Sequence, residues 1–187
     1  MTKRLIEEWL PIADLSEESI RERRSMTALP PIYYLHVWWA RRPLVASRAA
    51  VLASLLPADA DRKTFRHVLG IHGDPVASRR RIDAARRSGE RFEGQAYSYP
   101  RSFLYNLNES DHNWIQKEQK KLDLDSPAVL DPTAGGGSIP FESLRLGFQV
   151  YANDLNPVAV LVQKATYEWP VKYGSALLEE FNKLMRI

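Results

Sequence analysis

Cysteine is absent from the 187 residues of this chain. Its absence excludes disulfide bonds, cysteine-based zinc sites and thiol nucleophiles. It also agrees with a reducing compartment. The four histidines are scattered and show no spacing typical of metal ligands, so we expect no bound metal.

Long apolar runs and strong charge are also missing. The most apolar stretch, residues 43–57, is too short to span a bilayer and contains Arg48. The first ten residues lack the apolar centre of a signal peptide. We therefore expect a soluble, cytoplasmic protein with no membrane partner. A formal net charge of +3 permits nucleic-acid binding but does not require it.

The chain divides into two regions by pattern. In residues 1–125 the sequence predicts helices near the start, from Ser16, across 43–57, around the arginines of 79–87, and over 113–121. From residue 126 short apolar strands alternate with helices, which is typical of a parallel sheet. We expect an α/β fold: a mostly helical amino-terminal region, 1–125, and the start of a Rossmann-like domain, 126–187.

In the second region the predicted strands are 128–131 and 148–152, and a tight glycine loop, 132–137, follows the first strand. The predicted helices are 138–146, a segment from Pro157 towards Tyr167, and 175–185. A glycine turn between a strand and a helix lets a ligand approach the backbone, and the helix start presents free N–H groups.

Three kinds of ligand use such a loop. A phosphate-binding P-loop needs a lysine after its last glycine, but Ser138 and Ile139 follow Gly137, which excludes it. A dinucleotide site needs glycine at the sixth position, where this chain has Pro140, and this weakens that reading without excluding it.

S-adenosylmethionine is the third ligand and fits the order of residues best. Asp131 ends the first strand and Asp154 follows the second, with the glycine loop between them. A carboxylate such as Asp131 suits the ammonium group of the ligand, and one such as Asp154 can accept both ribose hydroxyls. A tight connection without a ligand is the alternative for this loop.

These segments also resemble a known family. Residues 131–142, Asp-Pro-Thr-Ala-Gly-Gly-Gly-Ser-Ile-Pro-Phe-Glu, resemble the first motif of amino-group DNA methyltransferases, and residues 153–159, Asn-Asp-Leu-Asn-Pro-Val-Ala, resemble the second. Residues 35–44, Leu-His-Val-Trp-Trp-Ala-Arg-Arg-Pro-Leu, resemble the amino-terminal signature of large bacterial adenine-specific DNA methylases that begin with a domain of unknown function. The resemblance covers roughly residues 16–175.

The resemblance implies a seven-stranded Rossmann-like sheet and methyl transfer from S-adenosylmethionine to the amino group of adenine in DNA. By analogy, segment 36–43 packs beside the methionine end of the cofactor. The cofactor-binding residues that it implies are Asp131, Pro132, Thr133, Ala134, Gly135, Gly137, Asp154, Leu155 and Asn156.

One family feature is missing. These enzymes hold the target amino group with an Asp/Asn/Ser-Pro-Pro-Tyr/Phe segment on a later strand. No such segment follows Asp154, and the Pro30-Pro31 pair follows a leucine. We therefore assign no catalytic residue and expect a truncated chain, or one half of a split enzyme with a second chain as partner. The alternative is a non-catalytic fragment that binds DNA or a partner subunit.

Aromatic and basic residues are candidates for DNA contact. The candidate DNA-binding residues are Trp38, Arg41, Arg42, Arg79 and Arg80. They would stack on bases or replace counterions on phosphates. The alternative is that the tryptophans fill the core and the arginines face water. Tyr97, Tyr99, Phe103 and Tyr105 likewise either stack on bases or anchor a loop in the core.

Overall fold

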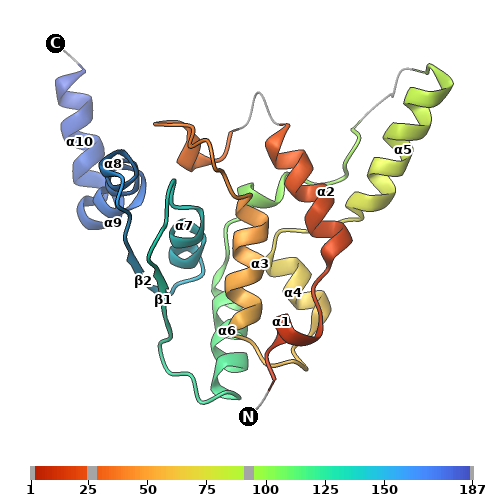
Figure 1. Ribbon diagram of the computed structural model, residues 1–187, viewed down its shortest axis with the longest axis horizontal. Helices are drawn as coiled ribbons and strands as arrows, with labels where there is room; N and C mark the ends of the chain where they lie inside the picture. The colour runs from red at the N-terminus through yellow and green to blue at the C-terminus, as the bar shows by residue number, and fades with distance from the viewer. Residues whose placement is uncertain (1–2, 25–28, 91–94, 186–187) are drawn as a thin grey trace.

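The computed structural model describes residues 3–24, 29–90 and 95–185. The described chain is mixed α/β and mostly helical, with one two-stranded parallel sheet. Its elements form layers: the sheet, then α7, then α3, then α2 and α4 (Figure 1). Helix α5 extends from one end of the molecule, and α9 and α10 lie at the other.

The amino-terminal region is helical, as the sequence predicts. Its elements are α1 (Leu5–Glu8), α2 (Ile12–Arg23), the 3-10 turn η1 (Pro31–Tyr33), α3 (Leu44–Ser54), α4 (Arg62–Val68), α5 (Pro75–Ser88), the 3-10 turn η2 (Ser102–Leu104) and α6 (Glu109–Lys120). Two predicted helix starts are wrong. Helix α2 begins directly after Pro11 rather than at Ser16, and α6 begins after Asn108, whose side chain accepts the N–H of Asp111 in a capping box.

The second region has the predicted strand and helix order. Its elements are β1 (Ala128–Asp131), α7 (Ser138–Arg145), β2 (Gln149–Ala152), α8 (Pro157–Gln163), the π-helical segment η3 (Lys164–Glu168), α9 (Trp169–Tyr173) and α10 (Ser175–Leu184). Strands β1 and β2 are parallel, and Asp131 is in register with Ala152. Both strands therefore end at the same edge of the sheet.

One hydrophobic core joins the two regions. It contains Leu5, Leu52 and Phe65 from the amino-terminal region together with Leu146 and Phe148 from the second. Because the core crosses residue 125, the glycine loop is held in place by helices from both regions. The division at residue 125 stays a prediction.

Two of the four aromatic residues in segment 97–105 are core residues. Tyr99 and Phe103 are buried, and Tyr99 donates to the buried carboxylate of Glu18 at 2.7 Å. For these two, the loop-anchoring alternative is therefore confirmed.

The sheet and the carboxyl-terminal helices leave apolar side chains exposed. Leu130 on β1 and Tyr151 on β2 are 69% and 54% exposed, on the face opposite α7. Parallel sheets in globular proteins are usually covered on both faces. Of the described helices, none combines the length and the apolar character needed to cross a membrane.

Candidate functional site

The candidate site lies where β1 and β2 end. The segment after β2 pairs with the glycine loop after β1, since Asn153 donates its N–H to Asp131 O and accepts the N–H of Ala134, both at 2.9 Å. The loop closes through a hydrogen bond from Gly137 N to Ala134 O at 2.8 Å. These backbone bonds fix the loop before any side chain is considered.

The Asp154 carboxylate strengthens this link. Its Oδ2 accepts the N–H of Gly135 at 2.7 Å, and its Oδ1 accepts the N–H of Asn156 at 2.8 Å. These backbone donors lower the pKa of Asp154 below its ordinary value of 3.8, because they stabilise the charged form. A carboxylate offers about four acceptor positions, so Asp154 keeps capacity for two further donors.

The indole of Trp38 covers one side of the loop. A Cβ at Gly135, where φ is +53°, would lie 2.8 Å from Trp38 Nε1. A Cβ at Gly136 would lie 2.7 Å from Trp38 Cβ. The first two glycines are thus required by a tryptophan of the same chain, and Trp38 is 8% exposed. Trp39 stacks on Trp38 with a centroid distance of 4.5 Å but is 73% exposed.

Residues of α8 and η3 hold the other side of the loop. Gln163 Nε2 donates to Gly135 O at 2.9 Å, and Tyr167 donates its hydroxyl to Gln163 Oε1, also at 2.9 Å. Burial raises the pKa of Tyr167, so its hydroxyl stays protonated and remains a donor at neutral pH. The loop is therefore fixed on both sides by side chains of this chain.

A hollow of about 540 Å³ opens between this loop and the amino-terminal region. Four of its lining groups are charged: Arg23 at the end of α2, Arg41 and Arg42 before α3, and Asp131 at the end of β1. The other lining residues are Tyr33, Trp38, Ala40, Pro43, Ala46, Ser47, Ala50, Thr133, Ala134, Gly135, Gly136, Ser138 and Ile139.

The sequence-predicted cofactor residues divide into two groups. Four of them line the hollow, namely Asp131, Thr133, Ala134 and Gly135. The other five lie outside it, namely Pro132, Gly137, Asp154, Leu155 and Asn156. Leu155 is 97% exposed, and Asp154 and Asn156 are half-buried. The hollow thus adjoins the strand β1 side of the predicted site, and the β2 side is open.

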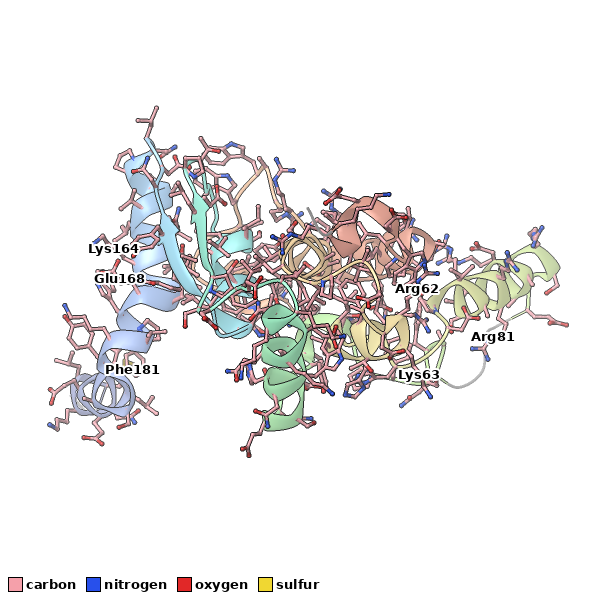
Figure 2. The ribbon with its side chains drawn as sticks, turned by 90° about the horizontal axis from the view of Figure 1, so that it is seen from below. Arg62, Lys63, Arg81, Lys164, Glu168 and Phe181 are labelled. Atoms are coloured by element: carbon pink, nitrogen blue, oxygen red, sulfur yellow. The ribbon has the colours of Figure 1, made fainter. Side chains whose placement is uncertain are left out.

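The predicted DNA-contact residues also divide. Trp38, Arg41 and Arg42 line the hollow, next to four of the predicted cofactor residues. Arg79 and Arg80 lie on α5, which projects from the opposite end of the molecule, where Figure 2 labels Arg81. Arg79 is paired with Asp83 at 2.9 Å, whereas Arg80 is exposed and makes no ion pair with a described residue.

Several hollow residues were not predicted. Arg23, Tyr33 and Ser47 come from α2, η1 and α3 and meet the loop only in three dimensions. Ser47 occupies an apolar stripe of α3, where its hydroxyl could have been noticed as unusual. Nothing in the sequence separates Arg23 from the other arginines.

A buried ion network fixes α7 on α3 beneath the hollow. Arg48 Nε donates to Glu142 Oε2 at 2.5 Å, and Arg145 Nη1 donates to Glu142 Oε1 at 2.9 Å. Arg48 and Glu142 are at most 1% exposed. Buried charges need such partners, so this network orients α7 and with it the loop at the start of α7.

Glu22 occupies the start of α3. Both of its carboxylate oxygens accept the N–H of Leu44, at 2.9 and 3.0 Å. Burial raises the pKa of Glu22 to about 7, and the backbone donors offset only part of that effect. The first backbone donor of α3 is thus occupied by a carboxylate of the protein itself.

Comparison with known proteins gives one match. Residues 9–71 match the model of a family described as a protein of unknown function, DUF1156. The match contains α2 and α3 and three of the four charged residues of the hollow, Arg23, Arg41 and Arg42. No curated protein and no solved structure matches the chain.

Proposed function

We propose that this chain is the cofactor-binding part of an S-adenosylmethionine-dependent DNA methyltransferase that acts on the amino group of adenine. One observation carries the proposal: two carboxylates follow two adjacent parallel strands, and a glycine loop lies between them. In open α/β sheets, ligands bind at the carboxyl ends of the strands. In this proposal β1, α7 and β2 begin a larger Rossmann-like sheet.

The residues at this edge fit S-adenosylmethionine. Asp131 lines the hollow and offers a carboxylate to the ammonium group, and Asp154 keeps acceptor positions for ribose hydroxyls. The adenine ring would lie towards the open side, near Leu155 and Asn156. When bound, the cofactor supplies an electrophilic methyl group on a sulfonium, which the adenine nitrogen would attack directly.

Binding of the cofactor product tests the proposal. We expect calorimetry on the full chain to detect S-adenosylhomocysteine and to detect no comparable affinity for NAD. Asp154→Ala should weaken binding about tenfold or more, since it removes an acceptor of charge-assisted hydrogen bonds. Asp125→Ala, at an exposed carboxylate outside the hollow, is the matched control. A folded wild type that binds NAD but not S-adenosylhomocysteine would contradict the proposal.

A split enzyme is the second candidate, and the exposed apolar row on α10 favours it. Its side chains are 41–69% exposed and comprise Leu177, Leu178, Phe181, Leu184 and Met185. Figure 2 shows Phe181 at the end of the molecule opposite α5. Large exposed apolar patches mark interaction surfaces. The test is transfer of a labelled methyl group to DNA, which should require a second chain carrying the Asp-Pro-Pro-Tyr type of segment.

A further inference from the structure

Three cations without an acidic partner surround the hollow. Arg23, Arg41 and Arg42 line it, and within the described residues none of them forms an ion pair. Five other arginines of the described chain are paired with carboxylates: Arg21, Arg48, Arg66, Arg79 and Arg145. Unpaired guanidinium groups at a concave surface favour an anionic ligand.

A buried hydroxyl points to the same place. Ser47 lines the hollow and is 4% exposed, and its Oγ has no hydrogen-bond partner. A buried polar atom without a partner is costly, so a ligand group that reaches Ser47 would relieve that cost. The first turn of α7, at Ser138 and Ile139, also lines the hollow and presents its backbone N–H groups.

The negative groups are arranged differently. Asp131 is the carboxylate that lines the hollow. Glu22 lies nearby, but both of its oxygens are bound to the backbone of Leu44. The hollow therefore has one acidic side and one side with three arginines. An α-amino acid group, with an ammonium and a carboxylate on one carbon, matches this separation of charge.

We propose that Arg41, with Arg23 and Arg42 beside it, binds the carboxylate of the amino-acid end of the cofactor while Asp131 binds its ammonium group. The inference rests on the proposed function and names the group that each side of the hollow takes. Arg41 is the best placed of the three, because it is half-buried and its Cζ lies 5.2 Å from the centroid of the Tyr33 ring. Arg23 Nη2 donates to Arg41 O at 3.2 Å, so the two residues form one unit.

A phosphate of DNA is a weaker match for these arginines. The hollow also contains the carboxylate of Asp131, which would repel a phosphate but would attract an ammonium group. Arginine binds a carboxylate through two parallel hydrogen bonds, a geometry that needs a positioned side chain such as one stacked on Tyr33.

Ligands that differ in one group test this inference. Calorimetry on the full chain would compare S-adenosylmethionine with its decarboxylated form, which lacks only the carboxylate. We expect wild type to prefer the complete cofactor by about tenfold to a hundredfold. Arg41→Met should abolish that preference and leave the affinity for the decarboxylated form unchanged. Arg86→Met, on exposed helix α5, should leave both affinities unchanged.

The outcomes separate the inference from the proposed function. If wild type shows the preference and the methionine variants of Arg23, Arg41 and Arg42 all keep it, the inference is overturned while the proposed function stands. If these variants instead lose affinity for a DNA duplex in fluorescence anisotropy and keep the preference, the arginines are phosphate contacts and the inference is again overturned. If folded wild type binds neither form of the cofactor, the proposed function itself fails.

Discussion

The carboxylate of Asp154 accepts the backbone N–H of Gly135 at 2.7 Å and so joins the segment after β2 to the loop after β1. A residue expected to serve only the ligand therefore also shapes the ligand site. Removal of this carboxylate changes the loop and the binding groups together, which makes its pH dependence informative.

Acid should weaken this link. The pKa of Asp154 is lowered in the folded protein, so its contribution to stability is present above its ordinary value of 3.8 and is lost as the pH falls through the lower folded value. We expect the urea midpoint of wild type to fall below pH 4 more steeply than that of Asp154→Asn. Equal slopes for the two proteins would show that the carboxylate contributes no such linkage.

Steric contact between Trp38 and the loop predicts a coupled pair of substitutions. Gly136→Ala places a Cβ 2.7 Å from Trp38 Cβ and should destabilise the fold by about 1–3 kcal/mol. The same substitution should cost less in a Trp38→Ala background, as a double-mutant cycle of urea unfolding would measure. Gly89→Ala is the control, because its Cβ meets nothing within 4 Å and only the positive φ costs about 1 kcal/mol. Additive effects would mean that Trp38 does not limit the loop.

The buried ion network should matter far more than an exposed pair. Glu142→Gln leaves Arg48 buried without its charged partner, and we expect a loss of about 3–5 kcal/mol in the free energy of unfolding. Arg79→Ala, which breaks an exposed pair on α5, should cost less than about 1 kcal/mol. Similar losses for the two variants would show that the network does not fix α7.

Raising the pH should destabilise the start of α3. The pKa of Glu22 is about 7 in the folded protein and 4.5 ordinarily, so the folded protein keeps a proton that the unfolded chain releases between these values. The resulting stability is complete below pH 4.5 and is lost as the pH rises to 7, by up to about 3 kcal/mol. Glu22→Gln should flatten this part of the stability profile in urea unfolding, and Glu109→Gln, at an exposed position, should not.

Two neighbouring arginines on α5 give a matched test of DNA contact. Arg80 is exposed and makes no ion pair with a described residue, whereas Arg79 is paired with Asp83. If α5 contacts phosphates, Arg80→Ala should reduce the salt dependence of duplex binding by about one counterion, and Arg79→Ala should reduce it less. Fluorescence anisotropy at several salt concentrations measures both slopes. Unchanged slopes would remove α5 from the DNA interface.

The sequence predicted the second region well because its signals are local. Apolar runs, a glycine turn and Pro157 gave β1, α7, β2 and the start of α8 within a few residues. The start of α2 was wrong, because Ser16 with its acidic neighbours looked like a helix start while Pro11 actually precedes the first turn. Helix α4 has few periodic apolar residues and was not predicted.

The hollow was only partly predictable. Asp131 follows from its place at a strand end, but Arg23 and Ser47 reach the site through the packing of α2 and α3. Trp38 shows the limit most clearly. Its sequence context suits either stacking on a base or burial in the core, and only the structure shows the indole lying against Gly135 and Gly136.

The most direct test of the central claim is a crystal structure of the full chain with S-adenosylhomocysteine. The account predicts electron density for the amino-acid end in the hollow between Asp131 and Arg41, with the ribose near Asp154. Clear density for the ligand at another surface, with this hollow empty at saturating concentration, would contradict it.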